Sequence, residues 1–333
     1  MDFLVIKRLG KHSKLREHQL ESNPMTPVSS SFPTLKLNQT TGPADAPIYG
    51  KTQTISNGSS IGAILVDTGR LSSENAERIL RLQVEGGKRF GDTAIELGLL
   101  TTDDICFALS RQFGNLYLPA SDTSLGHELI TAYKPLSPVV EKLRALRSQL
   151  MLHWFNAETR HNALAIMSSG VGEGRSFVAA NLAIVFSQLG ERTLLIDADL
   201  RNPCQHRLFK LGNNAGLSGM LAGRIGSDAI ARVSLLPGLY ILPAGAVPPN
   251  PQELIGRPGF ADLFQTLIRD FDIVIVDTPA ASEYAEAQMI AVGAAAALIL
   301  ARKNHSSVSD ISRLTHSLQQ TDTKLVGSVL NDF

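Results

Sequence analysis

From Ala163 to the end of the chain, short apolar runs alternate with longer segments of helical pattern. The runs are four to six residues long, as expected of buried strands. Strands separated by helices indicate a parallel sheet with helices on both faces, and therefore an α/β fold. The residues expected to form strands are 163–167, 193–197, 239–242, 273–277, 296–301 and 325–330.

Residues 60–117 carry a second pattern, which is helical and occurs twice at an offset of 29 residues. The sequence of residues 61–71 recurs in residues 90–100, and each copy predicts a short helix that stops at its second glycine. A longer helix would follow in each copy, capped by Ser72 or Thr101. We therefore expect a small, mostly helical domain built from two related hairpins.

The remaining segments show neither pattern. Residues 1–59 have a mixed-charge start followed by a run rich in Ser, Thr, Pro, Gly and Asn, which predicts a disordered tail. Prolines between the two patterned regions indicate a connector that ends at the predicted helix cap Ser137. The expected organisation is a tail over 1–59, a helical repeat domain over 60–117, a linker over 118–136 and an α/β domain over 137–333.

Composition narrows the classes of protein. The chain has 333 residues with 31 basic and 31 acidic side chains, so no global positive field exists to hold nucleic acid, and no nucleic acid partner is expected. The two cysteines are far apart and form no metal or redox spacing, which fits a reducing cytoplasm. The most apolar stretch, residues 285–301, is interrupted by polar residues, so no membrane span is expected.

A glycine-rich loop follows the first predicted strand of the α/β region and precedes a helix. Glycines let backbone N–H groups turn towards phosphate oxygens, and the helix N-terminus adds favourable potential. The pattern predicts a P-loop nucleoside triphosphatase sheet that binds ATP and Mg²⁺, with the Ser176 hydroxyl as a metal ligand. The residues expected to contact the nucleotide are Gly170, Val171, Gly172, Glu173, Gly174, Arg175, Ser176 and Phe177.

Acidic residues end two of the predicted strands. Asp197 and Asp199 close one strand and Asp277 closes another, and ligands of open parallel sheets bind beyond such carboxyl ends. One carboxylate can hold Mg²⁺ while another accepts a proton from an attacking hydroxyl. Arg175 stands where the motif usually has lysine, and Ser169 where it has its first glycine; a guanidinium can still neutralise phosphate oxygens.

The order of loop, Asp-x-Asp-x-Arg and strand-Asp-x-Pro resembles the bacterial tyrosine kinases that regulate polysaccharide chain length. The segment 249–254 and the terminal residues 329–331 are also similar to that family, and the resemblance covers residues 137–333. It implies an ATP-dependent protein-tyrosine kinase of exopolysaccharide synthesis. In this assignment Ser176 and Asp277 serve Mg²⁺, and the residues expected to be catalytic are Arg175, Asp197 and Asp199.

The resemblance also implies an assembly and a place in the cell. The spacing of Glu141, Arg144 and Arg147 matches the family motif that mediates ring oligomerisation, although a solvated helix face would look the same. A membrane-bound chain-length-determinant protein is the implied partner, and its cytoplasmic segment would activate the kinase. The chain would then be cytoplasmic and peripheral at the inner face of the plasma membrane.

One departure from the family pattern leaves two other functions open. The tyrosine-rich C-terminal tail of the family is absent, and the five tyrosines (49, 117, 133, 240 and 284) are scattered. The alternatives are a P-loop ATPase switch that is not a kinase and a nucleotide-binding adaptor of the polysaccharide machinery. 

The repeat region resembles another family. Residues 60–117 are similar to the N-terminal domain of type II secretion ATPases, in some of which paired Arg-Leu-Gly starts bind cyclic di-GMP. The second copy begins with Arg89, but the first begins with Ser60 and lacks the arginine that would fork around a phosphate or guanine. A docking or structural role is therefore favoured over nucleotide sensing.

Overall fold

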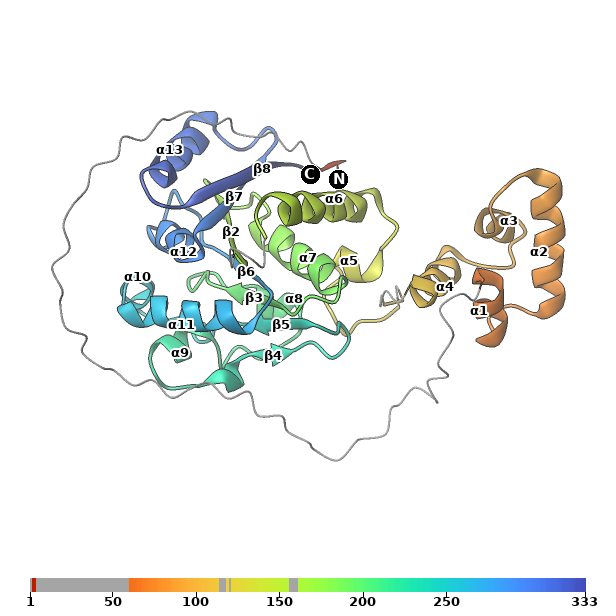
Figure 1. Cartoon of the computed structure of the whole chain (residues 1–333), viewed down its shortest axis with the longest axis horizontal. Helices are drawn as coiled ribbons and strands as arrows, with labels where there is room; N and C mark the ends of the chain where they lie inside the picture. Colours follow the sequence, from red (N-terminus) through yellow and green to blue (C-terminus); the bar gives the residue numbers. More distant parts are fainter. Residues whose placement is uncertain (1, 4–59, 114–117, 120, 156–160) are drawn as a thin grey trace.

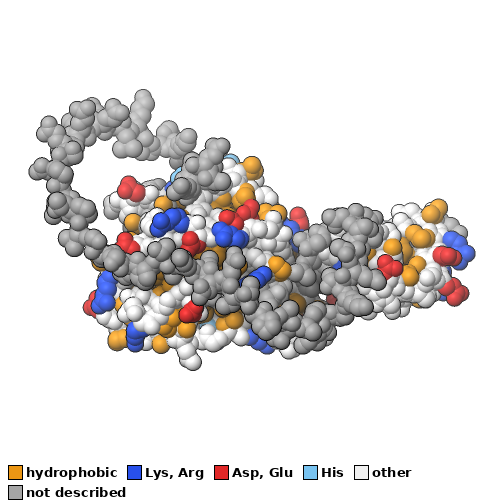
Figure 2. Space-filling model, turned by 60° about the horizontal axis from the view of Figure 1, so that its bottom comes forward, with side chains coloured by type: hydrophobic (Ala, Val, Ile, Leu, Met, Phe, Trp, Pro, Cys, Tyr) orange, Lys and Arg blue, Asp and Glu red, His pale blue; other side chains and the backbone are white. Residues whose placement is uncertain are grey.

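The computed structural model describes residues 2–3, 60–113, 118–119, 121–155 and 161–333. The predicted disordered tail lies outside these residues except for the two that form strand β1. Figure 1 shows a sheet covered by helices on both faces, with the helices α1–α4 set apart to one side. On the face shown in Figure 2, basic and acidic side chains are mixed, in keeping with the balanced charge of the sequence.

The sheet has eight strands in the order β1-β8-β7-β2-β6-β3-β5-β4. The six inner strands pair in parallel, and the two-residue edge strands β1 and β4 pair antiparallel. All six predicted strands are present, which confirms the α/β fold. Their bounds are β1 Asp2–Phe3, β2 Ala163–Ser168, β3 Thr193–Asp197, β4 Ala231–Arg232, β5 Leu239–Leu242, β6 Ile273–Asp277, β7 Ala296–Arg302 and β8 Lys324–Asp332.

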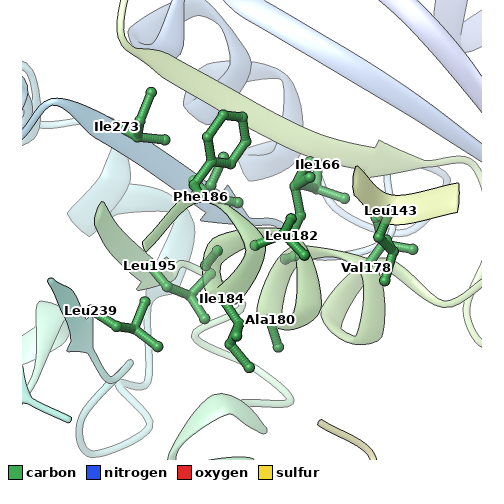
Figure 3. Close-up of a cluster of buried hydrophobic side chains, with 14 of the residues drawn as sticks. Leu143, Ile166, Val178, Ala180, Leu182, Ile184, Phe186, Leu195, Leu239 and Ile273 are labelled. Carbon is green, nitrogen blue, oxygen red and sulfur yellow. The ribbon is translucent and has the colours of Figure 1, made fainter. Parts of the chain in front are cut away.

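Two hydrophobic clusters lie on opposite faces of the sheet. Alternate residues of β2 join different clusters: Leu164 and Ile166 pack with α6 and α7, whereas Ala165 and Met167 pack with α11, α12 and α13. Figure 3 shows the first cluster, in which Ile166 lies beside Leu182 of α7. The helices of this unit are α5 Ile130–Tyr133, α6 Pro138–His153, α7 Arg175–Ser187, α8 Gln205–Leu208, α9 Leu217–Leu221, α10 Pro251–Ile255, α11 Pro258–Asp270, α12 Glu286–Ala294 and α13 Val308–Gln319, with a 3₁₀ turn at Ser227–Ala229.

The segment 118–136, expected to be a linker, differs from that expectation. Leu125, Leu129 and Tyr133 are buried in the same cluster as α6 and α7. The Thr131 backbone N–H donates to Asn181 Oδ1 on α7 at 3.0 Å. The prolines near residue 135 do not separate this segment from the α/β unit, because the apolar residues before them pack against α7. The described part of this segment therefore belongs to the core of the α/β unit.

The repeat region forms four helices, as its pattern predicted. Gly69 and Gly98 each take the left-handed conformation just after the short helices, with φ of 71° and 64°. The Ser72 hydroxyl accepts from the backbone of residue 75, and Thr101 and Asp104 cap each other reciprocally. The four helices share a small hydrophobic core of their own. The helices are α1 Ile61–Asp67, α2 Ser73–Gly86, α3 Phe90–Glu96 and α4 Thr102–Phe113.

Candidate functional site

The glycine-rich loop joins β2 to α7 at the carboxyl end of the sheet. Gly172 and Gly174 have φ of 74° and 93°, a backbone region that favours glycine. A Cβ on Gly174 would lie 2.5 Å from Asn331 Nδ2, so an alanine there would displace the side chain that supports the loop. The helix α7 starts directly after the loop and directs its N-terminal N–H groups towards the same space.

Two polar side chains fix the shape of this loop from within the protein. The Glu173 carboxylate is buried and accepts hydrogen bonds from the Gly170 backbone N–H at 2.9 Å and from the Ser306 hydroxyl. The Asn331 side chain on β8 donates to the Glu173 carbonyl at 2.8 Å. Glu173 was predicted among the nucleotide contacts, but its carboxylate faces Gly170 and Ser306, so only its backbone is available to a ligand.

Arg175 is buried and linked to both sides of the site. Its Nε donates to the Thr278 carbonyl at 2.9 Å, and its Nη1 donates to the Ser168 hydroxyl and the Gly170 carbonyl. These bonds hold the loop to the residue that follows β6. The guanidinium therefore lies at the base of the loop, where its charge also acts on the Asp277 carboxyl.

Asp197 and Asp277 are paired across neighbouring strands. They are register partners at the ends of β3 and β6, and both are fully buried. Burial raises the pKa of Asp277 to about 6, and the hydrogen bonds of the Ser176 hydroxyl and the Gln205 amide partly offset this. Burial, and then the charge of Asp277, raises the pKa of Asp197 as well. One oxygen of each carboxyl, Oδ1, has no hydrogen-bond partner.

Asp199 lies two residues beyond β3 and is 9% exposed. Its Oδ1 accepts from the backbone N–H groups of Arg201 at 3.2 Å and Asn202 at 2.9 Å, which fix its orientation. The Arg201 side chain turns away and pairs with the buried Glu286 at 2.6 Å. A carboxylate with this small exposed fraction and a fixed position is suited to accept a proton from a group that enters the site.

Gln205 is a site residue that the sequence analysis missed. It is fully buried at the start of α8, and its Nε2 donates to Asp277 Oδ2 at 2.8 Å and to the Ser176 carbonyl at 3.1 Å. Its backbone N–H donates to Asp197 Oδ2 at 2.9 Å. One residue thus contacts both carboxylates, and its side chain joins Asp277 to the start of α7. The sequence signal was weak, because a lone glutamine eight residues after a strand end has no distinctive pattern.

The arrangement fits a divalent cation of the magnesium type. The unpaired oxygens of Asp197 and Asp277 and the nearby Ser176 hydroxyl are hard oxygen donors. Among the described residues, no group of three or more His, Cys, Asp or Glu side chains forms a metal cage. Mg²⁺ is commonly held by one or two carboxylates together with substrate phosphates, and the donor set here is of that kind.

The other predicted site residues have different surroundings. Val171 is 56% exposed at the tip of the loop, and Phe177 is partly buried against the core. A hollow of about 530 Å³ lies beside Arg201, next to the segment whose sequence resembled the kinase family. It is lined by Arg201, Pro249, Asn250, Pro251, Gln252, Glu253 and Met289.

The three residues expected at an oligomer interface share helix α6 but differ in exposure. The Glu141 side chain is 75% exposed, whereas Arg144 is mostly covered and lies 3.3 Å from it. Arg147 donates to the Val185 carbonyl at 2.7 Å, and burial lowers the pKa of its guanidinium. Only Glu141 presents a largely exposed charge, so the two arginines also serve packing within the chain.

A parallel sheet with a glycine loop, a following helix and paired acidic strand ends defines a P-loop nucleotide-binding protein. The family model for the CobQ/CobB/MinD/ParA nucleotide binding domain matches residues 164–333, and the chain belongs to this family. Curated relatives narrow the class. The chain is 36% identical over 200 residues to the putative tyrosine-protein kinase CapB of Staphylococcus aureus, covering 60% of this chain and 86% of CapB. It belongs to the bacterial tyrosine-protein kinases with this domain.

Other relatives are longer than this chain. The tyrosine-protein kinase etk of Escherichia coli is 34% identical over 59% of this chain, but the match spans only 27% of etk. Among solved structures, the chimerical protein CapA2B2 matches with a TM-score of 0.58 and 34% identity over 67% of this chain and 96% of its own. The kinase domain of ETK matches with a TM-score of 0.58 and 32% identity, over 61% of this chain and 79% of its own.

In the part of the chain that the structure describes, none of the helices has the length and apolarity needed to cross a bilayer.

Proposed function

We propose that this chain transfers the γ-phosphoryl group of ATP to tyrosine side chains of proteins, and thereby regulates exopolysaccharide chain length, polymerisation and export. The observation that carries the proposal is the meeting of Asp197, Asp199 and Asp277 at the mouth of the glycine-rich loop, with two carboxyl oxygens unpaired. The similarity to CapB and etk supports a kinase over other P-loop activities. Relatives named for the cps region and EpsB support the polysaccharide setting.

The loop and the acidic strand ends divide the work of binding. The Gly170 N–H is bonded to Glu173, so the backbone N–H groups from Val171 to Ser176 would hold the phosphates, and the guanidinium of Arg175 at the loop base would add positive charge. Ser176 and Asp277, with Asp197 beside them, would hold Mg²⁺. When bound, Mg²⁺ neutralises the charge of the phosphate oxygens.

Asp199 is the residue best placed to act on the acceptor. It is the only one of the three aspartates with measurable exposure, and two backbone N–H groups hold it at the surface of the site. Its carboxylate would orient the tyrosine hydroxyl and accept its proton as the new bond forms. Asp197 is fully buried and would act on the metal instead.

Partner and place follow from the same proposal. A membrane-bound chain-length protein would activate the kinase through its cytoplasmic segment and keep it at the inner face of the plasma membrane. The match to the chimerical protein CapA2B2 over 96% of that chain supports a two-component arrangement of this kind. Homo-oligomers would form through α6, with Glu141 reaching a neighbouring copy.

One assay separates the proposed kinase from its alternatives. The protein is incubated with a partner's cytoplasmic segment, labelled ATP and Mg²⁺, and both phosphotyrosine and free phosphate are measured. Phosphotyrosine that is lost in Asp199→Asn, but retained in the exposed control Asp228→Asn, supports the kinase. Phosphate release without phosphotyrosine supports an ATPase switch. ATP binding without either product leaves a nucleotide-binding adaptor, and Arg175→Lys tests whether the arginine limits turnover.

A further inference from the structure

The loop after β6 brings a tyrosine next to the candidate catalytic site. Its backbone is tied to the glycine-rich loop, because the N–H groups of Ala281 and Ser282 donate to the carbonyls of Ser168 and Ser169 at 3.1 and 2.9 Å. The Tyr284 N–H donates back to Ala280 at 3.1 Å, which closes the turn. The turn that carries Tyr284 is therefore hydrogen-bonded to the start of the phosphate-binding loop.

The aromatic ring of Tyr284 also meets the residues that surround Asp199. The Arg201 guanidinium lies 4.3 Å from the ring centroid, and the Arg201 backbone N–H donates to Asp199 Oδ1. Arg201 is held in turn by the buried Glu286. This chain of contacts places the phenol and the proposed acceptor-side carboxylate on the same side of the site.

The other described tyrosines have different surroundings. The Tyr133 hydroxyl is buried and bonded to the backbone of Leu125, and Tyr240 on β5 is partly buried, with its ring packed against Phe271. Tyr49 and Tyr117 lie outside the described residues. Of the three tyrosines that the structure describes, Tyr284 is the one on a connecting loop at the carboxyl end of the sheet, where phosphoryl transfer would take place.

We propose that Tyr284 is a phosphoryl acceptor of this chain's own active site, which rests on the proposed kinase function and names a substrate for it. The bond between the γ-phosphorus and the β–γ bridging oxygen of ATP breaks, and a bond from the γ-phosphorus to Tyr284 Oη forms. ADP leaves with the electron pair, and the phenol proton passes to Asp199 and then to solvent. A hydrogen bond to Glu283, followed by burial, raises the pKa of the phenol, so the phenol needs such a base at neutral pH.

The test is phosphopeptide mapping of the full chain after incubation with ATP and Mg²⁺. Trypsin releases residues 270–302 as one peptide in which Tyr284 is the single tyrosine, and fragment ions separate it from Thr278 and Ser282. Phosphate on Tyr284, absent in Asp199→Asn and in Tyr284→Phe but retained in the matched variant Tyr240→Phe, is the expected result. Because the active site and the acceptor tyrosine belong to the same chain, the phosphate incorporated per molecule should stay constant when the protein is diluted.

A synthetic Glu-Tyr copolymer included in the same reaction keeps the two proposals distinguishable. If the copolymer is phosphorylated while Tyr284 stays unmodified, this inference is overturned and the kinase function stands. If neither carries phosphotyrosine, both are overturned. Incorporation at Tyr284 that falls in proportion to dilution contradicts transfer within one chain.

Discussion

Asp197 and Asp277 are two carboxyl groups buried side by side at the ends of neighbouring strands. Ordinary packing does not favour this, because burial and mutual repulsion both penalise the charged forms. Backbone N–H groups of α8 and the Gln205 amide satisfy one oxygen of each, and the other oxygen of each is left unpaired. A site that keeps such a cost is typical of one whose charge is neutralised by a ligand.

The raised pKa of Asp277 predicts how stability depends on pH. In the folded state its pKa is about 6, against 3.8 for a free aspartate. Between these two pH values the folded chain therefore keeps a proton on Asp277 that the unfolded chain has lost. Its contribution is intact below the lower value and is lost as the pH rises through 6. In EDTA, wild type should lose on the order of 3 kcal/mol of unfolding free energy relative to Asp277→Asn across this window, at about 1.4 kcal/mol per pKa unit.

Urea denaturation of both proteins at pH values below and above the window measures this difference. The exposed variant Asp228→Asn should track wild type throughout. Parallel profiles for wild type and Asp277→Asn would show that the carboxyl is already charged when folded.

Gln205 yields a second prediction at this scale. Gln205→Leu removes the amide that joins Asp277 to the Ser176 carbonyl, so the buried Asp277 carboxyl loses one of its hydrogen bonds. We expect the affinity for Mg²⁺-ADP to fall roughly tenfold, since a buried bond to a charged group contributes about 1.5–3 kcal/mol. Calorimetric titration measures it, with Gln265→Leu on the exposed face of α11 as the matched control. Unchanged affinity would mean that Gln205 supports only the fold.

At the scale of elements, the phosphate-binding loop is supported from elements far away in the sequence. The Glu173 carboxylate accepts from the hydroxyl of Ser306, which precedes α13, and the Asn331 amide from β8 donates to the Glu173 carbonyl. The loop conformation therefore depends on the last strand of the sheet. This support explains how a loop that lacks the usual first glycine and lysine still forms its turn.

Substitution of two glycines of the loop distinguishes the cost of backbone strain from the cost of a steric clash. Both Gly172 and Gly174 have positive φ, so alanine at either costs about 1–2 kcal/mol of unfolding free energy. A Cβ at residue 172 would meet nothing within 4 Å, whereas one at residue 174 must displace Asn331. Gly174→Ala should therefore be the more destabilising in thermal denaturation, and equal losses would argue against the Asn331 contact.

At the scale of the whole molecule, the packed core of the α/β unit includes residues that precede α6. Leu125 and Leu129 fill the cluster over α7, and the Gly126 N–H donates to the Leu208 carbonyl at 2.7 Å. The repeat domain has its own core of α1–α4 residues. The two units are thus stabilised by different sets of apolar contacts.

Truncation tests this division. A fragment of residues 118–333 loses only the two-residue edge strand β1 from the α/β unit, so it should unfold with a free energy close to that of the α/β transition of the full chain. A fragment of residues 137–333 should lose roughly 3–6 kcal/mol, because Leu125 and Leu129 each contribute about 1.5–3 kcal/mol when buried. Urea denaturation followed by the fluorescence of Trp154, which is buried in the same cluster, measures both. Equal stability of the two fragments would restore the linker interpretation.

The sequence determined the local elements and the position of the loop. The apolar runs predicted six strands to within two residues at each end, and the repeat of residues 61–71 predicted the left-handed glycines Gly69 and Gly98. These features depend on local periodicity and on backbone conformations that few residues adopt, so they can be read without neighbours. The meeting of Asp197 and Asp277 was also predicted, because parallel strands end at one edge of a sheet.

Only the tertiary structure decided which polar groups meet. Gln205 joins residues that are 29 and 72 positions away, and Tyr284 reaches Arg201 through the fold of a loop. The inward turn of the Glu173 carboxylate depends on Ser306, 133 residues later. Such contacts are set by strand order and packing, which bring together segments with no shared pattern in the sequence. For that reason the sequence located the candidate site, and the fold specified which side chains surround it.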